Sequence, residues 1–321
     1  MPQRSAASPA MPPAILAKLL GTAVFWGGTW IAGRVAVREV TPLAAASWRF
    51  FVAALILGAL VLAREGMPRW NRRDWLTLLA LGASGIFLYN ICFLYGLQRI
   101  EAGRGALVVA LTPAAVAAAD WLLFRAPMSP MKATGIMLAM TGCLVVVTNG
   151  DPLRLFAGEV GSGEWLILGC VVLWAAYTFI GRVGTRTLTP LAMTFGASLT
   201  GWAMLTVAAL LDGSLFAFDG AGWPGISSIV FLGLFGTALG FTWYAEAVEH
   251  IGATRASAFI NLVPLCAVLL GALLLGERIG LAALVGGVIV VAGVTLTNRA
   301  SARLVHAARA APAPAKLEKT A

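Results

Sequence analysis

The chain has 321 residues, of which 60% are hydrophobic and only 12% are charged. Because a soluble domain carries about 25% charged residues, this composition excludes an ordinary water-soluble fold and indicates a protein surrounded by lipid. The net charge of +9 does not indicate nucleic-acid binding, since the basic residues lie mostly between apolar runs.

Apolar runs long enough to cross a bilayer recur along the chain. Breaks at proline, glycine and charge clusters predict ten transmembrane helices, at residues 15–36, 43–62, 75–97, 103–124, 132–149, 163–181, 190–211, 223–245, 253–275 and 280–298. The links are too short for a soluble domain of ordinary size. The sequence therefore predicts an all-α polytopic membrane protein. Residues 1–14 and 301–321 are expected to be a disordered N-terminal tail and a cytoplasmic C-terminal tail.

The lysines and arginines of the loops predict the orientation in the membrane. If the N-terminus is cytoplasmic, the inside segments hold sixteen of these residues and the outside loops hold six. The acidic residues of the loops that follow the fifth and seventh predicted helices then fall outside. Both termini are therefore predicted to be cytoplasmic.

An internal repeat divides the chain into two halves. The stretch WGGTWIAGRVAVREVTPL begins at Trp26, and WAAYTFIGRVGTRTLTPL begins at Trp174, with eight identities at an offset of 148. Further identities, from Ile100 and Ile251 onward, have an offset of 151. Each half is predicted to hold five helices. Because five is an odd number, the two halves cross the bilayer in opposite directions. Residues 15–150 and 151–300 are thus predicted to form a 5+5 inverted repeat, as in many secondary transporters whose substrate site lies between the halves.

Pro113 and Pro264 lie at equivalent positions, near the middle of the fourth and ninth predicted helices. Each removes a backbone hydrogen bond and frees a carbonyl four residues earlier. Two interpretations stay open: a static packing kink, and a paired hinge that bends both helices during gating.

Arg104 and Arg255 begin the same two helices. Each either extends to the membrane interface or latches a gate by binding carbonyls or an acid of its own half. Glu101 and Glu249 are the acids nearest to them in sequence.

Arg49 lies about two turns into the second predicted helix, where a charge is costly and normally faces the protein interior. Substrate contact and structural anchoring are both open for it. No acidic residue lies at mid-helix, which disfavours proton antiport. The four cysteines and two histidines show no metal-ligand spacing, so we expect no enzyme, no metal and no cofactor.

Glycines at positions 135 and 142, and again at 286 and 293, are seven residues apart. This spacing places each pair on one helix face, where backbones can approach closely. Packing within the chain is the default explanation and a dimer contact the alternative, so we expect a monomer or a weak dimer.

Several segments together resemble the drug/metabolite transporter superfamily, and specifically its EamA-type branch of ten-helix transporters. They are WGGTW at Trp26–Trp30, Pro42 followed by WRF at Trp48–Phe50, IEAGRGALVVALTP at Ile100–Pro113, IGATRASAFINLVP at Ile251–Pro264 and LLLGERI at Leu273–Ile279. The first half departs from the pattern, because Phe124-Arg125-Ala126 stands where the second half has Leu275-Gly276-Glu277.

The resemblance implies a multi-pass carrier of the bacterial inner (plasma) membrane that moves metabolites, commonly amino acids, out of the cell. Within the branch, the likeness is greatest to the YddG-type aromatic amino acid exporters. The implied cavity lies between the halves. Its candidate substrate-binding residues are Trp26, Tyr89, Asn90, Trp174, Tyr177, Tyr244 and Asn261.

Aromatic and amide residues suit an organic solute with an apolar body, although part of the tryptophans and tyrosines would form interfacial belts. We therefore expect an exporter of aromatic and other neutral amino acids and related small metabolites that works by alternating access. A multidrug or other metabolite efflux carrier is the alternative. A membrane enzyme would need a cluster of His, Cys or carboxylates, and a lipid-linked-sugar flippase would need a basic cavity.

Overall fold

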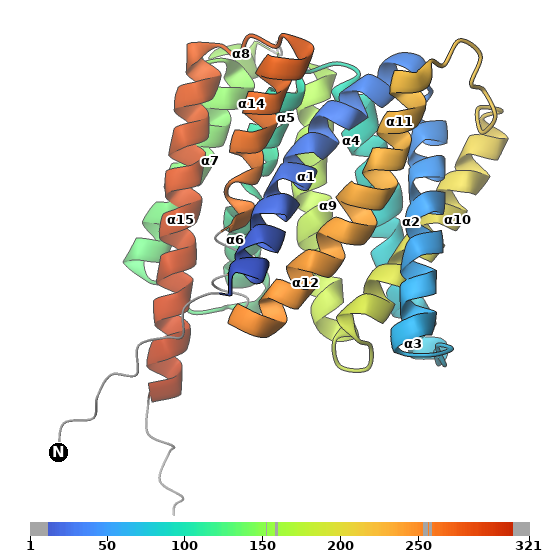
Figure 1. Ribbon diagram of the computed structural model, residues 1–321. Coiled ribbons are helices and arrows are strands. Elements are labelled where there is room, and N and C mark those ends of the chain that lie inside the picture. Colours follow the sequence, from blue (N-terminus) through green and yellow to red (C-terminus); the bar gives the residue numbers. More distant parts are fainter. Residues whose placement is uncertain (1–11, 152, 158–159, 253–255, 257–258, 311–321) are drawn as a thin grey trace, which may run out of the picture.

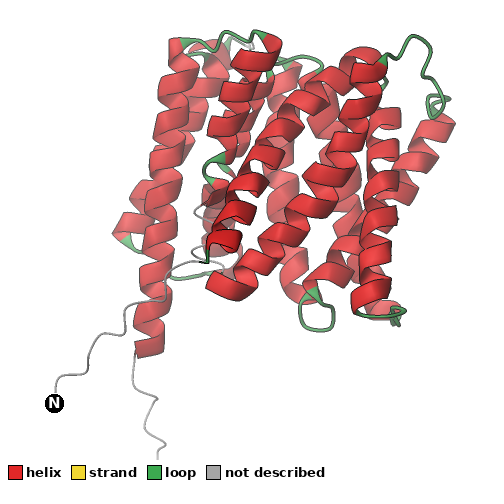
Figure 2. Cartoon of the chain, viewed as in Figure 1, coloured by secondary structure: helices red, strands yellow, loops and turns green. Residues whose placement is uncertain are grey.

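The computed structural model describes residues 12–151, 153–157, 160–252, 256 and 259–310, which form helices and no strand (Figure 1; Figure 2). Nine helical stretches of this part of the chain are long and apolar enough to span a membrane, and α14 is a shorter apolar helix. The all-α polytopic fold is therefore confirmed.

The spans of the two halves follow each other in the same order. The first half holds α1 (Pro13–Glu39), α2 (Pro42–Arg64), a third span of α3 (Arg72–Leu81), η1 (Gly82–Leu88) and α4 (Tyr89–Leu97), a fourth of α5 (Ala102–Val109) and α6 (Thr112–Phe124), and α7 (Pro130–Thr148). The short α8 (Leu153–Phe156) links the halves. The second half holds α9 (Ser162–Gly184), α10 (Pro190–Leu211), a third span of α11 (Trp223–Phe231), η2 (Leu232–Leu239) and α12 (Gly240–Ile251), then α14 (Val263–Leu275) and α15 (Leu281–Ala310).

The repeated Thr-Pro-Leu motif starts α2 and α10. Thr41 and Thr189 are the N-caps, and each hydroxyl accepts a hydrogen bond from the N–H three residues later. Pro42 and Pro190 occupy the first helical position, where a missing N–H costs nothing. This local chemistry explains why these three residues are identical in the two halves.

Each third span changes from α-helix to π-helix at its centre, in η1 and η2. Glycines at this point let a helix of the other half approach closely. A Cβ on Gly85 would lie 2.1 Å from the Tyr177 ring, and a Cβ on Gly236 would lie 2.5 Å from Thr29 Cγ2. Thr29 and Tyr177 are themselves related by the offset of 148. The same contact is therefore made twice, with the halves exchanged.

The fourth span lies at Ala102–Phe124, close to the expected residues 103–124, and a turn near the expected proline break divides it into two half-helices. Ala110 and Leu111 form a turn between α5 and α6, and Pro113 stands at the second position of α6. The Thr112 hydroxyl donates to the carbonyl oxygen of Val109 at 2.6 Å, which satisfies the carbonyl that the proline frees. In the second half, Asn261 lies in the equivalent turn before α14.

Helices at equivalent positions of the two halves pack against each other. α7 packs along α15 at one edge of the molecule and α2 along α10 near the opposite edge, while α1 and α9 lie between them (Figure 1). α1 contacts α11, η2, α12 and α14 of the second half, and α9 contacts α3, η1, α4, α5 and α6 of the first. The two halves therefore interlock rather than lie side by side as separate bundles.

The four glycines that are spaced seven residues apart in each half lie in the contact between α7 and α15. A Cβ on Gly142 would lie 2.6 Å from the Gly286 carbonyl oxygen, and one on Gly293 would lie 2.7 Å from the carbonyl oxygen of Gly135. These glycines are used for packing within one chain.

The helical part is longer at both ends than expected. α1 already begins at Pro13, and α15 continues to Ala310, into the segment expected to be a tail. The alanines and arginines after Asn298 are strong helix formers, which explains the extension. The rest of both predicted tails, residues 1–11 and 311–321, lies outside the described residues. The beginning of α1 and the end of α15 lie at the same end of the molecule (Figure 1).

Candidate substrate site between the two halves

Six aromatic side chains form a continuous series of ring contacts from one half to the other. We call this set the aromatic chain. It consists of Tyr244, Trp26, Phe241, Trp174, Tyr89 and Tyr177, from α12, α1, α12, α9, α4 and α9. The series branches at Trp174, which contacts both tyrosines, and the ring centroids of contacting members lie 5.3 to 6.4 Å apart. Such spacing is that of favourable tilted and edge contacts.

Phe241 is the member that connects the two repeat-related tryptophans. Its ring centroid lies 5.4 Å from that of Trp26 and 6.4 Å from that of Trp174. Phe241 is not among the candidate residues expected from the sequence. It occupies the position equivalent to Asn90 at the offset of 151, and applying the repeat to Asn90 would have found it.

Trp26 is fixed by both its ring and its N–H. Its indole Nε1–H donates to the Gly236 carbonyl oxygen in η2 at 3.0 Å. The side chains of Leu19, Thr22, Trp26, Tyr244 and Phe259 surround a gap that has no room for a water molecule. This side of the aromatic chain, toward the start of α1, is therefore closed by side-chain packing.

Tyr89 and Tyr177 both contact the Trp174 ring, with centroid distances of 5.5 and 5.3 Å. The Tyr89 ring also stacks on Phe93, which in turn meets the edge of the Trp30 ring. The aromatic contacts thus continue from the chain into the packed core of the first half.

Asn90 makes no ring contact of the aromatic chain and instead binds Arg49. Its Oδ1 accepts from Arg49 Nη1 at 2.9 Å, and its Nδ2 donates to the Ile86 carbonyl oxygen at 2.7 Å. Arg49 Nη2 also donates to Thr237 Oγ1 at 3.4 Å. A charged side chain of α2 therefore joins α4 of its own half to η2 of the other.

Arg104 binds an acid and a carbonyl oxygen, as one of the two interpretations expects, but the acid is not the one nearest to it in sequence. It pairs with Glu164 at the start of α9 at 3.1 Å and donates to the Val147 carbonyl oxygen at 2.9 Å. The acid belongs to the other half, not to its own, because the inverted packing brings α9 against α5. The second predicted latch residue, Arg255, lies outside the described residues.

At the end of the molecule predicted to be outside, Glu277 caps α5 across the repeat. Its carboxylate accepts from the N–H groups of Ala102 and Gly103, at 2.8 and 3.0 Å. Arg34 donates to the carbonyl oxygens of Leu97 and Ile100, at the end of the third span. The Gly-Glu element of the second half therefore supplies the carboxylate that caps the N-terminus of α5 in the first half.

At the opposite end, predicted to be cytoplasmic, charged side chains join the halves. Lys18 and Arg64 of the first half both contact the Glu246 carboxylate on α12. Arg182, the repeat equivalent of Arg34, pairs with Asp120 at 2.7 Å.

One further contact is made twice by repeat-related positions. Glu39, at the end of α1, accepts from the N–H of Gly225 at the start of α11, at 2.8 Å. Its equivalent, Thr187, donates to Asp74 near the start of α3, at 2.7 Å. The end of each first span is therefore bound to the start of the third span of the other half, on opposite sides of the membrane.

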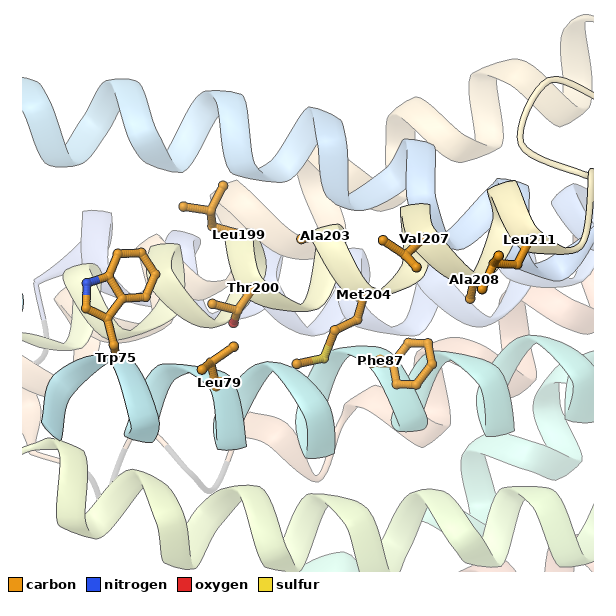
Figure 3. A pocket seen from close by; sticks show the side chains of 10 residues that line it. All are labelled: Trp75, Leu79, Phe87, Leu199, Thr200, Ala203, Met204, Val207, Ala208 and Leu211. Atoms are coloured by element: carbon orange, nitrogen blue, oxygen red, sulfur yellow. The ribbon is translucent and has the colours of Figure 1, made fainter. Parts of the chain in front are cut away.

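A large groove lies away from the aromatic chain, between α3–η1 and α10. It has a volume of about 700 Å³, and the side chains that line it are almost all apolar, among them Trp75, Phe87 and Met204 (Figure 3). Its open, apolar character fits a surface that faces lipid rather than a polar solute.

Known proteins resemble this chain over nearly all of its length. The EamA-like transporter family matches residues 13–148 and again residues 161–299. "Uncharacterized transporter YyaM" of Bacillus subtilis (strain 168) is 28% identical over 86% of this chain and 90% of its own length. "Probable terminal-alkyne amino-acid exporter" of Streptantibioticus cattleyicolor is 27% identical over 88% of this chain and 92% of its own length. A crystal structure with 18% sequence identity shares the fold, with a TM-score of 0.61 over 90% of this chain and 98% of that chain.

Proposed function

Because this chain belongs to the EamA-like transporter family, we propose that it exports aromatic and other neutral amino acids, and related small metabolites, across a bacterial inner membrane. The observation that carries the proposal is the aromatic chain, which joins α1 and α4 of the first half to α9 and α12 of the second. The amino-acid exporter among its relatives supports the substrate class.

Aromatic faces interact well with an apolar side chain, and each favourable ring pair contributes about 0.5–1.5 kcal/mol beyond its buried area. A solute that replaces the ring contacts of Trp174 or Phe241 therefore recovers much of the energy that is lost on opening the site. A highly charged solute would recover none of it. A neutral amino acid with an aromatic or aliphatic side chain fits these requirements best.

The interlocked halves support transport by alternating access. Repeat-related contacts, such as Glu39–Gly225 and Thr187–Asp74, fasten opposite ends of the molecule. Breaking one set opens one end while the other set stays closed, and exchanging the sets moves the opening to the other side. The aromatic chain lies between these ends and would be exposed to each side in turn.

Flux through the purified protein in liposomes tests this proposal. We expect saturable uptake of labelled phenylalanine that excess tryptophan and methionine inhibit and excess glutamate does not. Liposomes without protein are the control. Absence of saturable flux for every neutral amino acid would rule the proposal out.

Multidrug efflux is the second candidate, because a continuous aromatic surface also suits planar drugs. Drug susceptibility of a strain that overproduces the protein separates the two. Amino-acid export predicts unchanged inhibitory concentrations and a higher resistance to toxic amino-acid analogues. Multidrug efflux predicts the reverse.

A further inference from the structure

Arg49 is a buried charge to which the described part of the chain offers no acid. Its side chain comes from α2, and the residue is only 9% exposed. None of the ion pairs among the described residues includes it. Its acceptors are two neutral oxygens, at 2.9 and 3.4 Å, and its Nε has no hydrogen-bond partner.

A guanidinium carries five N–H donors, so these two bonds leave part of its capacity unused. The guanidinium carbon lies 4.9 Å from the centroid of the neighbouring Phe50 ring, which offsets only part of a full charge. A cation at the membrane centre is expensive unless an anion accompanies it. The site therefore favours a ligand that brings a negative group.

The two neutral acceptors are themselves fixed. Asn90 donates to the Ile86 carbonyl oxygen in η1, and the Thr237 hydroxyl donates to the Leu232 carbonyl oxygen in η2, at 3.0 Å. Arg49 is thus held between the π-helical segments of both halves in a defined orientation. Preorganisation of this kind is typical of a binding group rather than of a side chain that merely avoids lipid.

Both hydrogen-bond partners of Arg49 lie within about one helical turn of a member of the aromatic chain. Asn90 follows Tyr89 directly in sequence, and Thr237 lies four residues before Phe241, on the same span. One bonded partner of Arg49 is therefore adjacent to a member of the aromatic chain in each half.

We propose that Arg49 binds the carboxylate of the transported amino acid while the aromatic chain contacts its side chain. This inference rests on the proposed function and assigns the residue that recognises the shared acidic group. The longer bond to Thr237 is the one that a carboxylate oxygen replaces when the site opens. The guanidinium then binds the carboxylate with two parallel N–H···O bonds.

Substrate analogues test the assignment in the wild-type protein. Phenylalaninol has the ring and the amine of phenylalanine but an alcohol in place of the carboxylate. A hydrogen bond to a charged group contributes about 1.5–3 kcal/mol, so phenylalaninol should inhibit labelled phenylalanine uptake at least about tenfold more weakly than phenylalanine does. Equal inhibition by both would overturn the inference and leave amino-acid export intact. Absence of any amino-acid flux would overturn the proposed function itself.

Variants separate binding from anchoring. In Arg49→Gln, phenylalanine and phenylalaninol should inhibit almost equally. In Arg49→Lys, the KM for phenylalanine should rise several-fold and the inhibition constant of phenylalaninol should stay the same. Arg69→Gln, in an exposed loop, is the matched control and should keep the wild-type preference. If either Arg49 variant weakens inhibition by phenylalanine and inhibition by phenylalaninol by the same factor, Arg49 is a structural anchor and the inference fails.

Discussion

Phe241 and Asn90 occupy the same position of the repeat but contribute differently to the site. Phe241 lies between the rings of Trp26 and Trp174, whereas Asn90 lies against Arg49. The backbone of the two halves is pseudo-symmetric, but the side chains at this position differ. One half provides an apolar contact and the other a polar contact. A solute with an apolar end and a charged end can use this asymmetry to bind in one orientation.

Replacement of Trp174 removes three ring contacts at once, to Tyr89, Tyr177 and Phe241. Trp174→Ala should therefore raise the KM for phenylalanine about tenfold, which corresponds to about 1.4 kcal/mol, while the protein stays folded. Trp165→Ala, on an exposed part of the same helix, should leave the kinetics unchanged. Wild-type kinetics in Trp174→Ala would exclude this residue from the site.

Arg125 ends α6 in the left-handed conformation, with φ of 52°, at the position where Gly276 ends α14 with φ of 65°. A side chain in this conformation costs about 1–2 kcal/mol, part of which a glycine gives back through its greater freedom in the unfolded chain. Arg125→Gly should therefore raise the melting temperature in detergent slightly, and Gly276→Arg should lower it. Opposite signs in thermal unfolding would contradict this account.

At the scale of the elements, broken helices are what distinguish the site from a simple bundle. The fourth span breaks at Ala110 and Leu111, and the third spans change their helix type beside the aromatic chain. Irregular backbone inside a membrane is tolerated only where protein or a water-filled space satisfies it. We propose that these breaks mark the part of the molecule where a polar solute is accommodated.

Pro113 and Pro264 interrupt the fourth span of each half. Each stands at the second position of its helix, α6 or α14, and prevents the helix from continuing from the residues before it. Pro113→Ala and Pro264→Ala should slow the exchange between inward-open and outward-open states several-fold, since a straightened span bends less readily. Labels at the two ends of the molecule, followed by single-molecule fluorescence, measure this exchange. Pro68→Ala, in the loop between α2 and α3, is the control. Unchanged exchange in both proline variants would leave them only a packing role.

The α7–α15 contact acts as a rigid edge. A side chain on Gly286 would collide with the Gly142 carbonyl oxygen, which cannot move without displacing α7. Gly286→Leu should therefore destabilise the protein by more than about 1–3 kcal/mol, the usual cost of overpacking. Val288→Leu, on the exposed face of the same helix, should change the melting temperature little. Equal stability of the two variants would show that the edge can adjust.

The number, order and repeat of the spans could be predicted from the sequence, because apolar length and the identities around Trp26 and Trp174 are local properties. The exact position of each break was harder to predict, because Pro113 indicated a kink but not a turn at Ala110. Partners such as Glu164 for Arg104 depend on helices that meet only after folding. Reading the inverted repeat as a set of exchanged contacts would have found Phe241, but not the link between Glu277 and α5.

At the scale of the whole molecule, the charged contacts that join the halves within the described residues form two groups, one at each end of the spans. Glu277 and Glu39 bind helix starts of the opposite half at one end. Lys18 with Glu246, and Arg182 with Asp120, join the halves at the other. The aromatic chain and Arg49 lie between them. In the alternating-access mechanism that we propose, a transport cycle releases one group of contacts while the other holds.

Counterflow tests the central claim most directly, because it needs a site that is open alternately to each side and that binds the amino acid. Liposomes that contain the protein are loaded with unlabelled phenylalanine and placed in a trace of labelled phenylalanine. We expect a transient accumulation of label above its equilibrium level, which is absent when the inside is loaded with glutamate instead. Entry of label at the rate of protein-free liposomes, for phenylalanine and for every other neutral amino acid, would contradict the central claim.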